Sequence, residues 1–191
     1  MAKKFKVIYP YQICVSGAAM GSSVKKSHDL AKAAGKRIAE RGHTLLTGAT
    51  SGLPNYAAQG AKESGGISVG FSPASSRREH INSYRLPVEY YDTILCTGFG
   101  YTGRDLLLVR SADAVITVGG RVGTLQEFAV AFEEKTPIGI ITGSGGITDA
   151  IKDVLKAAKR SRNTVVFHHD PARLVDEMIK ILDEKYSHPD L

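Results

Sequence analysis

Short apolar runs typical of β-strands alternate with amphipathic runs typical of helices along almost the whole chain. The clearest strand is residues 114–118 (AVITV), which are apolar and β-branched, as expected of a strand covered on both faces. No hairpin signal separates consecutive strands, so the order favours a parallel sheet with helices on both faces. We expect an α/β fold, a three-layer α/β/α sandwich whose mostly parallel sheet has about seven strands.

The same alternation gives the positions of the individual elements. Strands are expected at residues 12–16, 43–47, 66–71, 94–97, 114–118, 137–142 and 164–168. Helices are expected at about residues 27–41, 55–64, 124–135 and 148–159, with another beginning near Arg104 and a last one running from Asp170-Pro171 to about Glu184. A length of 191 residues suits one domain spanning residues 1–191.

Residues 72–91 interrupt the alternation, because they show no hydrophobic period and contain several turn formers. A loop of this length inside a compact domain is usually functional or mobile. His80, together with Arg77, Arg78 and Arg85, would then form a lid over an anionic ligand. A basic loop without that role is the alternative interpretation.

A glycine-rich turn follows the strand at residues 114–118. Gly119, Gly120 and Gly123 let the backbone approach a ligand closely and expose its N–H groups. Thr124 is expected to open the next helix, whose free N–H groups and positive dipole end attract an anion. Phosphate is the expected anion, and Glu127 would place a carboxylate beside it, one turn into the helix.

The other glycine-rich loops also follow strands, and in a parallel sheet such loops meet at one edge, where ligands bind. The spacing Gly17-x-x-x-Gly21 misses the dinucleotide fingerprint G-x-G-x-x-G, and no acidic residue closes the second strand to hold a ribose. The P-loop pattern is also missing. The sequence therefore does not predict NAD, FAD or nucleoside triphosphate binding.

The net charge of +6 allows binding to nucleic acids or to anionic metabolites. Most of the excess is scattered over helix faces, and neither an aromatic-interleaved RNA signature nor a zinc-ligand spacing occurs, so nucleic acid and metal are not expected partners. Pro10 and Gln12 interrupt the N-terminal segment, which makes it a poor signal peptide, and no run could span a membrane. Cys14 and Cys96 are expected to be unbridged core thiols, so the expected compartment is the cytoplasm.

Three separated motifs resemble the Lonely Guy (LOG) family and its wider SLOG superfamily. They are ICVSGAAMGSS, LAKAAGKRIAERGHTLLTGATSGL and RDLLLVRSADAVITVGGRVGTLQE, and the resemblance covers roughly residues 12–135. The resemblance implies a Rossmann-like homodimer or higher homo-oligomer that hydrolyses nucleoside 5′-monophosphates to free base and ribose 5-phosphate. The wider superfamily also includes a molybdenum-cofactor carrier.

The family's G-G-x-G-T-x-x-E motif falls on residues 120–127, which puts its catalytic glutamate on Glu127. The family arginine falls on Arg104, nine residues before Asp113, and the upstream glycine-rich motif falls on residues 47–55. The chain departs from the family pattern at several places. Arg121 replaces a glycine, Asp105 replaces a lysine, and Pro54-Asn55 replaces Met-Gly. Two further glycines of the upstream motif are Thr47 and Ala49 in this chain.

Glu127 and Arg104 suit the cleavage of an N-glycosidic bond. A carboxylate can stabilise the oxocarbenium character of the sugar and position water, and an arginine can hold a phosphate or the charge on the leaving base. Each residue also has a purely structural interpretation. Residues 124–127 match a T-x-x-E capping box, and Arg104 would pair on a helix surface with Asp105 or Asp113.

We therefore expect a LOG-like nucleotide-binding protein in which Arg104 and Glu127 hydrolyse a nucleoside 5′-monophosphate without a metal or other cofactor. The alternative is a non-catalytic binding protein, either a nucleotide sensor or a carrier of a phosphorylated cofactor such as the molybdenum cofactor. Single-stranded DNA binding is a third, less favoured class. The residues expected to hold the ligand and its phosphate are Ser16, Gly17, Gly48, Ala49, Thr50, Gly52, Gly119, Gly120, Arg121, Gly123 and Thr124.

Overall fold

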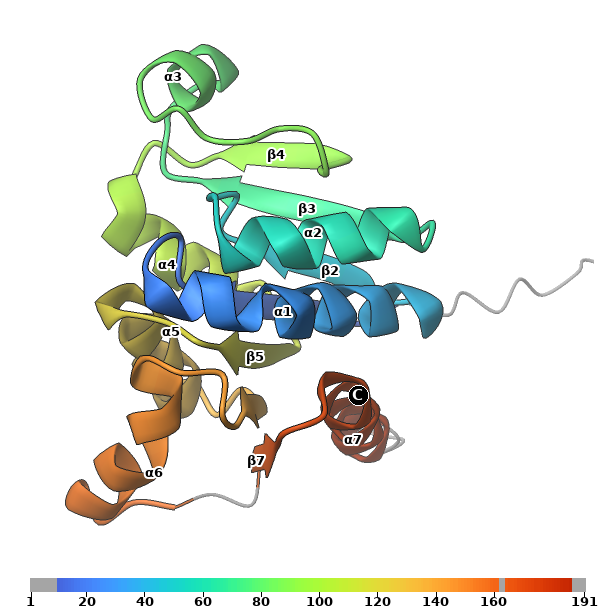
Figure 1. Cartoon of the computed structure of the whole chain (residues 1–191), viewed down its shortest axis with the longest axis vertical. Helices are drawn as coiled ribbons and strands as arrows, with labels where there is room; N and C mark the ends of the chain where they lie inside the picture. The colour runs from blue at the N-terminus through green and yellow to red at the C-terminus, as the bar shows by residue number, and fades with distance from the viewer. Residues whose placement is uncertain (1–9, 162–163, 187–191) are drawn as a thin grey trace, which may run out of the picture.

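The computed structural model describes residues 10–161 and 164–186 of the chain (Figure 1). Within these ranges seven strands alternate with seven helices. The strands are β1 (Gln12–Gly17), β2 (Thr44–Thr47), β3 (Ile67–Ser72), β4 (Thr93–Cys96), β5 (Ala114–Val118), β6 (Ile138–Ile141) and β7 (Val165–His168). The helices are α1 (Ser22–Glu40), α2 (Leu53–Glu63), α3 (Arg77–Asn82), α4 (Gly100–Arg110), α5 (Val122–Glu133), α6 (Ile147–Ala157) and α7 (Pro171–Tyr186).

The seven strands form one sheet in the order β4-β3-β2-β1-β5-β6-β7, and every neighbouring pair is parallel. The prediction of a parallel sheet with about seven strands is thus confirmed. The chain builds outward from β1 to β4 and then returns to lay β5 on the other side of β1, where Ser16 pairs with Thr117. Ligands of such sheets bind at the carboxyl ends of the strands beside this reversal.

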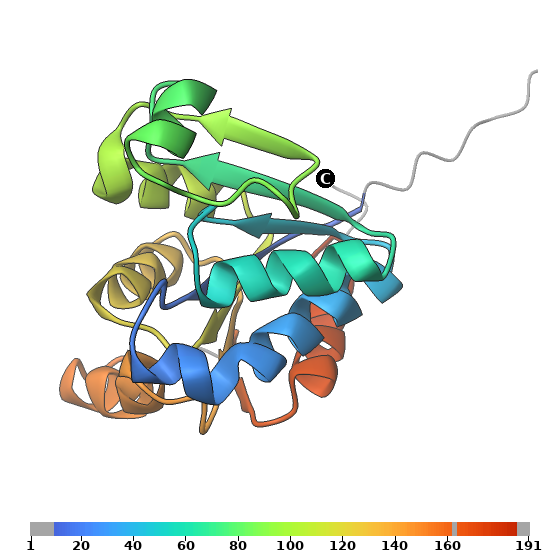
Figure 2. The same cartoon turned by 45° about the horizontal axis from the view of Figure 1, so that its top comes forward.

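Two helical layers cover the sheet, which confirms the predicted three-layer sandwich (Figures 1 and 2). Helices α1, α2 and α7 pack on one face, and α4, α5 and α6 pack on the other. Alternate residues of the fully buried strand β5 serve the two cores. Ile116 belongs to the cluster with Ile38 and Leu174, whereas Val115 belongs to the cluster with Leu108 and Phe128.

Helices α1 and α2 lie unusually close together because of two glycines. A Cβ atom on Gly35 would overlap the carbonyl oxygen of Ala57, and one on Gly60 would overlap that of Lys32. Only glycine allows the two backbones to approach this far. The loops that lead into these helices, residues 18–21 and 48–52, also meet, because the Leu53 N–H at the start of α2 donates to the Ala18 carbonyl oxygen (2.9 Å), and both loops contribute to the site described below.

The first helix is longer than the sequence predicts. It begins at Ser22 instead of near residue 27, and the backbone is non-helical at Ser27 (φ −128°, ψ 15°). The Ser27 hydroxyl donates a 2.6 Å hydrogen bond to the carbonyl oxygen of Ser144, in the loop after β6. The predicted start coincides with this kink.

The prediction of irregular structure throughout residues 72–91 is wrong at α3. Ser76 caps this short helix by accepting a hydrogen bond from the Glu79 backbone N–H (3.2 Å), and the Glu79 carboxylate accepts one from the Ser75 N–H (2.7 Å). These reciprocal bonds resemble a capping box. The S-x-x-E spacing signals the cap, but six residues are too few to show a hydrophobic period.

Within the described ranges, no helix is long and apolar enough to cross a membrane. Cys14 is buried, Cys96 is partly buried, and both are free thiols. The basic residues at positions 1–9, which enter the signal-peptide argument, lie outside the described residues.

Candidate ligand-binding site

A cavity of about 550 Å³ opens at the carboxyl edge of the sheet, beside the junction of β1 and β5. Its wall combines the loops after β1 and β2, the segment 84–86, one face of α4 and the start of α5. The volume is typical of a small-molecule site. The predicted residues that line it are Ser16, Gly17, Gly48, Thr50, Arg104, Arg121, Gly123, Thr124 and Glu127. The predicted residues outside its wall are Ala49, Gly52, Gly119 and Gly120.

The Gly119-Gly120 turn supports the site from behind. The Gly119 N–H donates to the Ser144 hydroxyl (2.8 Å). It therefore does not face the cavity, although the sequence predicts that it would. The two glycine carbonyls accept hydrogen bonds from the first N–H groups of α6, at Ile147 (3.1 Å) and Thr148 (3.2 Å). Positive φ angles of 59° and 110° at the two glycines make this turn possible. The turn therefore braces the start of α5 against α6.

Helix α5 begins at Val122, so the prediction that Thr124 opens it is wrong by two residues. Arg121 occupies the N-cap position in an extended conformation, no side chain caps the helix, and its first turn holds no acidic residue. Gly123 and Thr124 line the cavity. The uncapped, electropositive end of α5 therefore faces the space in which a ligand would sit.

The capping-box interpretation of Glu127 is also wrong. The Glu127 carboxylate accepts a hydrogen bond from the Ser16 hydroxyl at the end of β1 and does not return to the start of its own helix. Glu127 is only 7% exposed, and burial together with the nearby Asp105 raises its pKa to about 7. The side chain is thus fixed at the bottom of the cavity and is able to exchange a proton near neutral pH.

Arg104 is buried (5% exposed), which excludes the surface-helix interpretation. Its Nη1 atom donates to the carbonyl oxygens of Gly48 and of Phe71 (2.8 Å to Phe71), at the ends of β2 and β3. A Cβ atom on Gly48 would overlap this guanidinium, so glycine is required there. Asp113 does not contact Arg104, because it accepts from the Gln12 N–H (2.7 Å).

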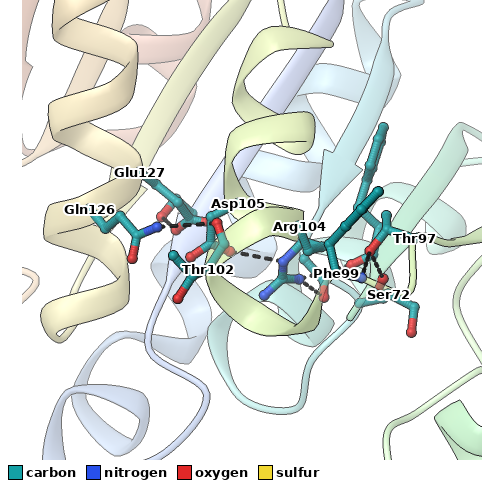
Figure 3. A network of polar contacts seen from close by, with 12 residues as sticks. Ser72, Thr97, Phe99, Thr102, Arg104, Asp105, Gln126 and Glu127 are labelled. Carbon is teal, nitrogen blue, oxygen red and sulfur yellow. Dashed lines mark hydrogen bonds and ion pairs between the residues drawn. The ribbon is translucent and has the colours of Figure 1, made fainter. Parts of the chain in front are cut away.

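Asp105 completes a buried charged cluster formed by Ser16, Arg104, Asp105 and Glu127. Asp105 Oδ1 accepts from Arg104 Nε at 2.8 Å, and Figure 3 shows Asp105 of α4 beside Glu127 of α5. Burial raises the pKa of Asp105 although Arg104 opposes the change, and a hydrogen bond links its carboxyl group to that of Glu127. Two carboxyl groups in such contact share a proton. We assign this proton to Glu127, because Asp105 has the arginine beside it.

Asp105 is absent from the predicted site residues, although its departure from the family pattern was a signal. Tyr84, Leu86 and Tyr101 also line the cavity and were not predicted. The rings of Tyr84 and Tyr101 meet edge to face with centroids 5.7 Å apart, and the Arg104 guanidinium lies 5.8 Å from the Tyr101 ring centroid. Tyr101 precedes Arg104 by three residues on α4, and this helical spacing was the available signal.

His80 does not form part of a lid, because it is fully buried. Its Nε2 atom donates to the Pro87 carbonyl oxygen (3.0 Å), so Nδ1 accepts from the Ser72 hydroxyl (2.8 Å). His80 therefore anchors residues 83–88 to the end of β3. Of the four predicted lid residues, Arg85 does line the cavity, with an unusual φ of 54°.

In the part of the chain that the structure describes, no group of three or more His, Cys, Asp or Glu side chains is arranged to hold a metal ion. His168 and His169 stack on each other with ring centroids 4.9 Å apart. His168 Nδ1 accepts a hydrogen bond from the Asp170 N–H (2.9 Å), which gives this histidine a structural role at the end of β7.

Known proteins share both the sequence pattern and the fold. An uncharacterised protein from Archaeoglobus fulgidus is 35% identical over 123 residues, which cover 64% of this chain and 74% of that protein. The molybdenum cofactor binding protein from Rippkaea orientalis superposes with a TM-score of 0.72 at 29% identity, covering 92% of this chain and 99% of that one. The Moco carrier protein from Chlamydomonas reinhardtii superposes with a TM-score of 0.75 at 27% identity, covering 93% and 99%.

The resemblance to the SLOG superfamily is confirmed by a family model. The model of the SLOG cluster4 family matches residues 10–175, which include every strand, the whole cavity wall and the buried charged cluster. The chain therefore belongs to the SLOG cluster4 family.

Proposed function

We propose that this protein binds a phosphorylated small molecule of nucleotide size in the cavity and holds it without cleaving it, as a carrier or sensor does. The observation that carries the proposal is the uncapped end of α5 opening into a cavity that also presents Arg85 and Arg121. Both arginines are exposed. Free helical N–H groups, a positive dipole end and guanidinium groups are the elements that bind phosphate.

The structural relatives favour one cargo. Two of them bind or carry the molybdenum cofactor by name, and the alignments cover 99% of each of those chains. This cofactor is a pterin that bears a phosphate, which matches the phosphate-binding chemistry at the start of α5. We therefore put it first among the candidate ligands, ahead of nucleoside monophosphates.

Two measurements test this proposal. Calorimetric titration with AMP, GMP, CMP and UMP is expected to give saturable binding of at least one of them. Protein purified from a host that makes molybdenum cofactor is expected to carry molybdenum and a fluorescent pterin in equal amounts. Absence of binding in the titrations together with absence of pterin and molybdenum would refute the proposal.

Gly123 provides a variant that separates binding from folding. A Cβ atom at this position would meet no atom within 4 Å, so a small side chain fits. Gly123→Asp would stabilise the start of α5 by about 0.3–1 kcal/mol, yet its carboxylate would occupy and repel the phosphate position. We expect binding to weaken at least tenfold in Gly123→Asp and to be retained in the uncharged control Gly123→Ser.

Hydrolysis of an N-glycosidic bond is the second candidate, favoured by one observation. Glu127, whose pKa is about 7, faces the same cavity as Arg104, and such a carboxyl group suits acid–base chemistry. Two contacts weigh against it. Glu127 shares its proton with Asp105, and the Nε and Nη1 atoms of Arg104 are already bonded within the protein. Release of free base from a nucleoside monophosphate, abolished in Glu127→Gln, would establish hydrolysis and refute simple carriage.

A homodimer and a cytoplasmic location complete the proposal. Apolar side chains are exposed on and beside α4 and on the edge strand β4, which supports self-association: Leu95, Phe99, Leu106 and Leu107. Light scattering on the purified protein measures the assembly. The free thiols Cys14 and Cys96 support a reducing compartment.

A further inference from the structure

The floor of the cavity presents an ordered set of hydrogen-bonding groups that phosphate binding does not use. Arg104 supplies the donor. Its Nε and Nη1 atoms are bonded to Asp105, Gly48 and Phe71, while Nη2 donates to no acceptor in residues 10–161 and 164–186. Arg104 is only 5% exposed and lines the cavity. Nη2 is thus an unused pair of N–H donors available to a ligand.

Asp105 and Glu127 supply the acceptors beside this donor. Each carboxylate has about four acceptor positions. Asp105 uses one on Arg104 Nε and Glu127 uses one on the Ser16 hydroxyl, apart from the hydrogen bond between the two carboxyl groups. Both side chains line the cavity, so their remaining lone pairs are open to a ligand. From α4 to α5 the floor therefore presents a donor on Arg104, an acceptor on Asp105 and an acceptor on Glu127.

We infer that this floor recognises a 2-amino-4-oxopyrimidine ring, the ring that guanine and pterins have in common, through Arg104, Asp105 and Glu127. The edge of that ring presents a carbonyl oxygen, a ring N–H and an amino group in a row, which is the complementary order of acceptor, donor, donor. Adenine presents an amino donor beside a ring nitrogen acceptor and does not match. This inference rests on the proposed function, because it concerns the same cavity.

The walls suit a flat, phosphorylated ring. The Tyr101 ring lies beside the Arg104 guanidinium, and the Tyr84 ring meets the Tyr101 ring edge to face. The two rings therefore provide an aromatic surface next to the floor. Arg85 and Arg121 are exposed and remain available for a phosphate that points away from the floor. Ring recognition inside and phosphate recognition at the entrance thus use separate groups.

Ligands that differ in one group test the inference on the wild-type protein. GMP and IMP differ only by the 2-amino group, and pterin and lumazine differ by 2-amino against 2-oxo. A lost hydrogen bond to a charged acceptor predicts at least tenfold tighter calorimetric binding of GMP than of IMP or AMP if the ligand is a nucleotide. If the ligand is a pterin, the same factor is expected for pterin over lumazine.

Two variants assign the preference to the floor. At pH 8, where most wild-type Glu127 is ionised, Asp105→Asn and Glu127→Gln are each expected to reduce the preference for the amino compound to less than threefold, because each replaces a carboxylate oxygen with an N–H donor. The matched control Glu133→Gln alters an exposed carboxylate farther along α5, outside the cavity wall, and it is expected to keep the full preference. If Asp105→Asn fails to fold, Glu127→Gln and the wild-type comparison still decide.

The outcomes distinguish this inference from the proposed function. Equal binding within each ligand pair would overturn the inference and leave phosphorylated-ligand binding intact. Failure of all five compounds to bind would overturn the inference, whereas the proposed function falls only if CMP and UMP also fail to bind and no pterin or molybdenum copurifies with the protein. A preference that survives unchanged in both floor variants would also overturn the assignment of the ring to these residues.

Discussion

Replacing Glu127 with glutamine is expected to make the protein more stable at alkaline pH and to leave it nearly unchanged at pH 5. The glutamine oxygen can accept from the Ser16 hydroxyl, and its amide nitrogen can donate to Asp105, as protonated Glu127 does. Glu127→Gln therefore imitates the neutral form of the residue. The variant removes the charge that the wild type must bury once the carboxyl group loses its proton.

The magnitude follows from the pKa of Glu127, which is 4.5 in the unfolded reference and about 7 in the folded protein. A difference of about 2.5 corresponds to about 3 kcal/mol at 1.36 kcal/mol per pKa unit. The folded state holds the proton up to a higher pH, so the free energy of unfolding is highest below pH 4.5 and decreases as pH rises through 7. Sharing of the proton with Asp105 makes about 2–3 kcal/mol the expected loss by pH 8.

The assay is urea denaturation of wild type and Glu127→Gln at pH 5, 6, 7 and 8. The difference in unfolding free energy between the two proteins is expected to grow by about 2–3 kcal/mol across this range. Glu133→Gln on the same helix is the matched control, because the Glu133 side chain is 68% exposed and its charge is solvated. A constant difference between Glu127→Gln and wild type over the four pH values would refute the reasoning.

Three other substitutions test the packing and the entrance of the cavity. Arg85→Gly relieves a left-handed φ of 54°, so the thermal unfolding midpoint is expected to be no lower than in the wild type. Titration of the same variant is expected to show weaker binding of the phosphorylated ligand. Equal affinity would show that Arg85 does not contact the ligand. Gly35→Ala forces a methyl group onto the Ala57 carbonyl and is expected to cost about 1–3 kcal/mol in urea denaturation, so an unchanged midpoint would contradict the close approach of α1 and α2. Arg37→Ala breaks hydrogen bonds of 2.9 and 3.1 Å to Asp176. Because the pair is partly exposed, the free energy of unfolding in urea is expected to fall by less than about 1 kcal/mol, and the difference is expected to disappear in high salt. A larger loss that does not depend on salt would contradict this weak surface pairing.

The fold is predictable from the sequence because each element carries its own period. The strand at residues 114–118 is apolar throughout, and its neighbours alternate with amphipathic helices, so the parallel sheet and its two covering layers follow. Helix α3 does not follow, since six residues held by Ser76 and Glu79 leave no periodic signal. The kink at Ser27 depends on the carbonyl of Ser144, which is distant in sequence.

The candidate site is only half predictable, and the reason is competition between local and distant partners. Residues 124–127 match a capping box, but Ser16 on another strand takes the carboxylate of Glu127. Arg104 was identified through a family motif, whereas its burial depends on carbonyls at the ends of β2 and β3. Tyr84 reaches the cavity because His80 anchors its segment, a contact that no local pattern reveals.

The contact between Ser16 and Glu127 joins residues 111 positions apart, and it exists only when β5 has docked on β1. Strands β1 to β4 are connected in sequence by shorter crossovers, so they are able to assemble first. The contact between Ser16 and Glu127 closes a much longer loop, and closing it costs more conformational entropy. We therefore expect the cavity to be completed late in folding. On this expectation, a ligand that binds the cavity stabilises the native state without stabilising the folding transition state. Its presence should lengthen the lifetime of the folded protein while the rate of refolding stays the same.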